Sequence, residues 1–90
     1  MTRRTKFKIG DIIRINKAYI SVLGGNWAEK YLSSELNCII GAIKSIDNSN
    51  ITACYTVKIG DKDFVLNQNF VDKFCKKGSK TEYVLYGQNG

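Results

Sequence analysis

The chain has 90 residues, of which 43% are hydrophobic and 11% aromatic, and it carries a formal net charge of +6. This length predicts a single domain, and the apolar content excludes wholesale disorder. No apolar run is long enough for a membrane helix, and no apolar segment follows the basic N-terminus as a secretory signal would require. We therefore expect a cytoplasmic protein that does not contact a membrane.

The cysteines bear on redox and metal chemistry. There are three of them, without Cys-x-x-Cys spacing, which favours a reducing compartment over a disulfide framework. The chain has no histidine, so the thiols make a poor metal site. No serine or cysteine has an identifiable base. We expect a non-enzymatic protein with no catalytic residue, no metal and no cofactor.

In chain order, residues 1–5 are expected to form a solvated basic arm. A tight turn then follows at Gly10 and Asp11. Glycine permits such a turn, and the aspartate is expected to accept hydrogen bonds from nearby backbone N–H groups rather than to bind a ligand.

The first strand is predicted at residues 9–16. Side chains alternate along an extended chain, so Ile13 and Ile15 should share one face of the strand. Ile12 and Arg14 should share the other.

A long connection, residues 17–35, is expected to carry a short helix. Asn26 and Glu29 have the spacing of a capping box at its start. Trp27 and Tyr31 are four residues apart and share a face. They either hold the loop against the domain or offer a stacking platform for bases. Packing is favoured for Trp27, and Tyr31 is retained as a candidate for base stacking.

The rest of the chain predicts short strands at 36–46, 51–59, 64–67 and 71–75, with one helical turn at 68–70. Within 51–59 the odd-numbered residues should share one face. Gly41 lies mid-strand, where barrel strands often bend or bulge. The expected core residues are Ile13, Ile15, Ile43, Tyr55, Val57 and Leu66.

The pattern Phe7-x-Ile9-Gly10-Asp11-x-Ile13-x-Ile15 resembles the opening of SH3-like barrels of bacteria and phages, including KOW-type modules. The resemblance covers residues 6–75 and departs at Asn37, where many relatives have glycine. It implies an all-β, five-stranded SH3-like barrel, with a basic arm before it and a linker and strand after it at 76–90. The later matching segments are Trp27, Gly41-Ala42-Ile43, Tyr55-Thr56-Val57, Phe64-Val65-Leu66 and the pair Val71 and Phe74.

The excess positive charge is confined to two flanks, one before the first strand and one around residues 73–80. The first and last strands of a barrel are neighbours, so the flanks should converge into one patch that binds the phosphates of DNA or RNA. Basic ends that merely aid solubility are the plainer interpretation. The candidate nucleic-acid-binding residues are Arg3, Arg4, Lys6, Lys8, Lys76, Lys77, Lys80 and Tyr31.

An alternative function is protein–protein interaction. Tyr83, Val84, Leu85 and Tyr86 predict an extra apolar strand that pairs with a partner's sheet edge or with a second copy of the chain. Such a protein would be a module that docks on a host protein, for example a phage-encoded effector or inhibitor.

Overall fold

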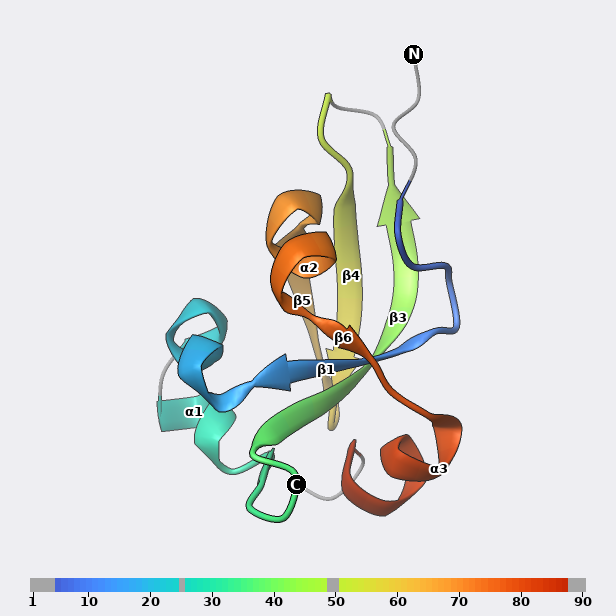
Figure 1. The fold of residues 1–90 in the computed structure, drawn as a ribbon. Helices are drawn as coiled ribbons and strands as arrows, with labels where there is room; N and C mark the ends of the chain where they lie inside the picture. Colours follow the sequence, from blue (N-terminus) through green and yellow to red (C-terminus); the bar gives the residue numbers. More distant parts are fainter. Residues whose placement is uncertain (1–4, 25, 49–50, 88–90) are drawn as a thin grey trace.

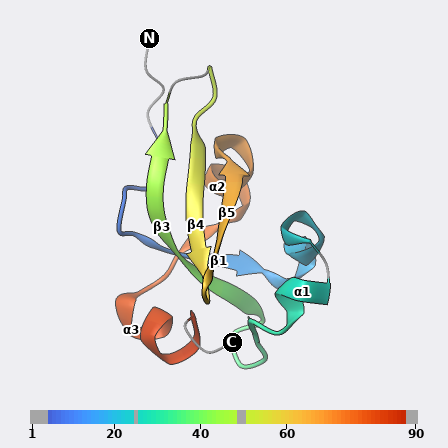
Figure 2. The ribbon, with the colours of Figure 1, turned by 180° about the vertical axis from the view of Figure 1, so that it is seen from behind.

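The computed structural model describes residues 5–24, 26–48 and 51–87. Its strands form one antiparallel sheet with the order β5-β4-β3-β1-β6, and a short strand, β2, pairs with β3 off this path. Figure 1 shows β1 and β6 crossing β3, and Figure 2 shows β3, β4 and β5 side by side. The strands are β1 (Ile12–Asn16), β2 (Leu32–Ser33), β3 (Cys38–Asp47), β4 (Cys54–Ile59), β5 (Lys62–Asn67) and β6 (Lys76–Lys77).

The long strand β3 is the centre of the sheet. Its first half pairs with β1, where Ile13 faces Gly41, and its second half pairs with β4, where Ile46 faces Tyr55. The described strands leave the sheet open, with β5 at one end and β6 at the other. The domain is therefore strand-rich and antiparallel, as the sequence predicts.

The bend predicted at Gly41 lies further along β3. The register shifts between Ile43 and Ser45, so the irregularity follows the glycine instead of containing it. Gly41 is required by packing, because a Cβ at this position would lie only 2.6 Å from Cγ1 of Val57. The glycine thus lets the side chains of β4 approach β3 closely.

The two faces of β1 follow the predicted alternation. Ile13 and Ile15 are fully buried in the main core, on what we call the inner face of the sheet. Ile12 belongs to a second, smaller cluster on the outer face. All six expected core residues are buried. Ile51, predicted to share their face, is instead exposed because β4 begins only at Cys54.

The connection after β1 has more structure than one helix. It contains the 3₁₀ helix η1 (Lys17–Leu23), the predicted short helix α1 (Asn26–Glu29) and β2. The side chain of Trp27 lies outside the described part. Asn37, at the entrance to β3, takes a left-handed conformation with φ of 54°. Asparagine tolerates this region, so it replaces the glycine that the resemblance leads one to expect.

The strand predicted at residues 71–75 is wrong. The segment is helical, in α2 (Gln68–Phe74), which Asn67 caps by accepting a hydrogen bond from the backbone N–H of Asn69 at 2.7 Å. Val71 and Cys75 are four residues apart and both buried in the main core. That spacing suits a helix covering the inner face.

The extra strand predicted at residues 83–86 is also wrong. Ser79 and Glu82 form a capping box that starts a single helical turn, α3 (Lys80–Glu82), and a π-helical turn, η2 (Tyr83–Gly87), continues it. Tyr83 and Tyr86 pack on the outer-face cluster. None of the helices in the described part of the chain is long and apolar enough to cross a membrane.

Candidate functional site

Of the predicted basic residues of the first flank, the structure describes Lys6 and Lys8. Arg3 and Arg4 lie outside the described residues. Lys6 is exposed beside α2, where its backbone N–H donates to the carboxylate of Asp72 at 3.3 Å. Lys8 is exposed in the turn, and its backbone N–H donates to Asp11 at 2.9 Å. This contact confirms the structural role that we predict for Asp11.

The second flank is neighbour to the first strand, as predicted. In the β1–β6 pairing Arg14 faces Lys76 and Ile13 faces Lys77. Alternation therefore directs Lys76 to the outer face, beside Arg14, and turns Lys77 to the opposite side of the strand. Lys80 is exposed on α3. Among the described lysines of this flank, the register thus places Lys76 and Lys77 on opposite sides of β6.

Tyr31 does not offer a surface for bases. It is 5% exposed and belongs to the main core. Its hydroxyl donates to the carboxylate of Asp61 at 3.0 Å. Its ring packs so closely on Gly60 that a Cβ at that position would lie only 2.2 Å from Cε1 of the ring. The ring therefore holds the long connection against the β4–β5 turn, which is the packing interpretation.

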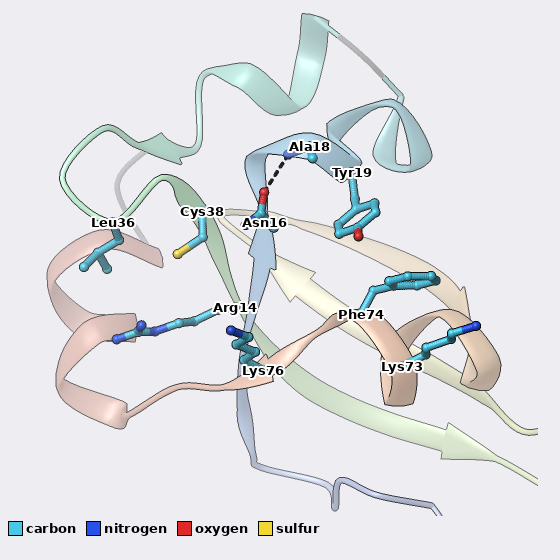
Figure 3. A pocket seen from close by; sticks show the side chains of 9 residues that line it. All are labelled: Arg14, Asn16, Ala18, Tyr19, Leu36, Cys38, Lys73, Phe74 and Lys76. Atoms are coloured by element: carbon cyan, nitrogen blue, oxygen red, sulfur yellow. Dashed lines mark hydrogen bonds between the residues drawn. The ribbon is translucent and has the colours of Figure 1, made fainter.

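The structure brings other side chains together in a groove on the outer face, which we call the outer groove (Figure 3). It has a volume of about 570 Å³. Among the described residues that line it, three are basic and none is acidic. The lining residues are Arg14, Asn16, Ala18, Tyr19, Leu36, Cys38, Lys73, Phe74 and Lys76.

The floor of the outer groove follows from the register of the sheet. Arg14 and Asn16 are two residues apart on β1 and so share its outer face. The strands on either side place Cys38 opposite Asn16 and Lys76 opposite Arg14. The side chain of Asn16 accepts a hydrogen bond from the backbone N–H of Ala18 at 2.8 Å, which turns the chain into η1 at one end of the groove.

An aromatic wall flanks the outer groove. Tyr19 of η1 and Phe74 of α2 have ring centroids 4.9 Å apart, and Phe70 contacts both, at 5.7 and 5.8 Å. Phe74 is 39% exposed. The ammonium of Lys73 lies 5.5 Å from the centroid of the Phe74 ring, a cation–π distance. The wall thus combines accessible ring surface with positive charge.

The opposite end of the outer groove is set by an ion pair. Both oxygens of Glu82 accept hydrogen bonds from the guanidinium of Arg14, with Nε at 3.0 Å from Oε1. Glu82 also caps α3, so the pair ties the C-terminal segment to β1. Burial raises the pKa of the Cys38 thiol, against the opposing effect of Arg14. Cys38 is therefore a protonated, inert lining residue at neutral pH.

The C-terminal segment explains why only part of the outer face is open. Tyr83 and Tyr86 cover Ile12 and Ile40, and the hydroxyl of Tyr86 donates to Glu35 at 2.8 Å. Val84 and Leu85 are 63% and 55% exposed. The segment thus closes on its own sheet as a helical turn and leaves the outer groove uncovered beside it.

Sequence reasoning identified Lys76 but missed the rest of the outer groove. Lys73 lies in the basic flank that we recognised, and Arg14 was placed correctly on the outer face of β1. Pairing the first strand with residues 76–77 in register would have placed Lys76 beside Arg14. Tyr19 and Phe74 carried no recognisable motif.

Within residues 5–24, 26–48 and 51–87 no three Cys, Asp or Glu side chains cluster as metal ligands would. The three cysteines are free thiols. Comparisons with protein-family models, curated proteins and solved structures found no match to this chain.

Proposed function

We propose that the protein is a non-enzymatic nucleic-acid-binding domain whose outer groove receives the phosphate backbone. One observation carries the proposal: Lys73 and Lys76 line the outer groove, no carboxylate is among its lining residues, and the Arg14–Glu82 ion pair lies at its end. Cations arranged in this way bind phosphates by releasing counterions, largely without regard to sequence. Lys6, Lys8, Lys77 and Lys80 are exposed outside the lining of the outer groove and add to the positive charge of the protein.

We also propose that the open sheet is a relative of SH3-like barrels. The support is topological: β1, β3, β4 and β5 are successive neighbours in an antiparallel sheet, and the longest connection follows β1. Such folds host unrelated functions, so the functional proposal rests on the groove and not on this kinship.

Binding of DNA or RNA to the wild-type protein should fall steeply with salt. If the two groove lysines neutralise about two phosphates, log–log slopes of about −1.5 on single strands and about −2 on duplexes are expected. Fluorescence anisotropy with labelled 20-mers between 25 and 250 mM NaCl measures these slopes. An absence of binding at the lowest salt, or a flat response, contradicts the proposal.

Two adjacent lysines provide a matched pair of variants. Lys76→Glu changes a groove residue, and it should weaken binding to all sequences and lower the salt slope by at least about 1. Lys77→Glu makes the same charge change on the other side of β6, and it should have a clearly smaller effect. Equal losses would indicate a diffuse field instead of a site in the outer groove.

A protein partner is the second candidate. The observation that favours it is the neighbouring pair of exposed apolar side chains Val84 and Leu85 on η2. Pairing of this segment with a sheet edge is no longer tenable, since it is not a strand. A host protein or a second copy would instead dock against the helical turn, and Val84→Ser with Leu85→Ser would abolish that contact without affecting the outer groove.

A further inference from the structure

The aromatic wall of the outer groove is not explained by the core alone. Val71 of α2 is completely buried, whereas Phe74, three residues later, is 39% exposed at the end of the same helix. Its ring is held in place by Tyr19 and Phe70. A fixed, accessible ring at the edge of a basic groove is the arrangement with which proteins stack unpaired bases.

Resting on the proposed function, we propose that the ligand of the outer groove is single-stranded nucleic acid, with one base stacked on Phe74 and a flanking phosphate on Lys76, beside the Arg14–Glu82 ion pair. Figure 3 shows Tyr19 and Phe74 on one side of the groove and Arg14 on the other, with Lys76 between them in this view. A nucleotide has the same two parts, a flat ring system and an anionic backbone.

The local chain geometry places these two parts at a suitable separation. Phe74 ends α2, and Lys76 follows after one residue, Cys75, whose backbone is extended. Arg14 lies directly across the strand pair from Lys76. The stacking ring at the end of α2 and Lys76 on β6 are therefore close along the chain, and no long loop separates them.

The preference for single strands follows from the accessibility of ring faces. In a duplex each base is stacked between its neighbours, so Phe74 could not reach a base face without unstacking the helix. The volume of about 570 Å³ is in the range of pockets that enclose one small molecule. A duplex can contribute phosphates to the cations, but only an unpaired base can use the aromatic wall.

The decisive experiment compares Phe74→Leu with wild type on labelled dT12, rU12 and a 12-base-pair duplex, by anisotropy at low salt. Loss of one stacking contact should weaken binding to both single strands about tenfold or more and leave duplex binding within about twofold. Phe74→Tyr, which keeps the ring, should bind as wild type does. Phe64→Leu, a ring removed from β5 instead, is the control and should leave all three affinities unchanged.

A measurement on the wild-type chain makes the test independent of any variant. Addition of dT12 should shift the ring-proton NMR signals of Phe74 and Tyr19, and addition of the duplex should shift backbone amides of Arg14 and Lys76 without moving the Phe74 ring. Unmoved ring signals with dT12, or equal loss of single-strand and duplex affinity in Phe74→Leu, would overturn the stacking proposal.

The outcomes separate this inference from the function on which it rests. Salt-dependent binding that is indifferent to Phe74 would overturn stacking and leave phosphate binding intact. Failure of the wild type to bind any of the three ligands would overturn both. Binding of free thymidine monophosphate as tightly as dT12 would assign the groove to a mononucleotide and also contradict a strand ligand.

Discussion

At the scale of single residues, the carboxylate of Asp72 joins three parts of the chain. It accepts hydrogen bonds from the hydroxyl of Tyr55 at 2.6 Å, from the side chain of Gln68 at 3.1 Å and from the backbone N–H of Lys6 at 3.3 Å. Burial, together with the hydrogen bond from the Tyr55 hydroxyl to Asp72, raises the pKa of Tyr55 to about 12. Burial, with a smaller effect of Asp72, raises the pKa of Cys75 to about 12.

These two shifts predict a loss of stability in alkali. Both groups are neutral when protonated and hold their protons more tightly in the folded state, so their contribution is complete below about pH 9 and is lost as the pH rises towards 12. Each can lower the free energy of unfolding by up to about 1.4 kcal/mol per pH unit. Urea unfolding between pH 8 and 11.5 gives the free energy of unfolding of wild type and of Tyr55→Phe at each pH. The wild type should lose stability more steeply than the variant as the pH rises, and an equal pH dependence of the two proteins would contradict the role of Tyr55.

At the scale of elements, the C-terminal segment from Ser79 to Gly87 covers part of the outer face, where Tyr83 and Tyr86 pack on the smaller cluster. Its helical start depends on the capping box, and Glu82 serves both that box and Arg14. Gly78 joins it to β1, with its backbone N–H donating to the carbonyl of Ile12 at 2.7 Å. A backbone hydrogen bond and a side-chain ion pair therefore both hold the segment against β1.

Ending the chain after Gly78 should destabilise the domain. The truncation uncovers Ile12 and Ile40, which are now nearly completely buried, and we expect a loss of about 2–4 kcal/mol and a melting temperature lower by about 10 °C or more. Calorimetry of the truncated and full chains measures this. Val84→Ala changes an exposed residue of the same segment and should alter stability by less than about 0.5 kcal/mol. A truncated chain as stable as the full one would make the segment a passive tail.

The elements also show how far the sequence could predict this fold. Period-two alternation was enough for β1 and for the core of β4, because a strand buried on one face has a single register. It failed at residues 71–75 and 83–86, because segments of four or five residues are too short to distinguish a period of two from a helical period. Asn67 before one segment and the Ser79–Glu82 spacing before the other were helix-start signals that decide the matter.

The candidate site was less predictable than the fold. Lys76 followed from counting charge along the chain. Its position beside Arg14 and Phe74 depends on the pairing of β1 with β6 and on the end of α2, which bring together residues far apart in the sequence. That is a tertiary property, and no local pattern in the sequence expresses it.

At the scale of the whole molecule, the main core is one contiguous cluster that includes residues of β1, β3, β4, β5, α1 and α2. Ile15 is fully buried within it. Ile15→Ala should lower the free energy of unfolding by about 2–5 kcal/mol, a large share of the stability of a domain this small. Thermal unfolding followed by circular dichroism should show one cooperative transition at a clearly lower temperature, and an unchanged midpoint would contradict the register.

The pairing of β1 with β6 joins two segments from nearly opposite ends of the chain. The pairs β3–β4 and β4–β5 join strands that are consecutive in the chain, whereas about sixty residues separate β1 from β6, and loop-closure entropy grows with that length. The outer groove is lined by residues from both strands of this β1–β6 pair and from the segments next to them. It is therefore complete only when the chain is fully folded, so any molecule that occupies it must stabilise the native state in proportion to the logarithm of its concentration.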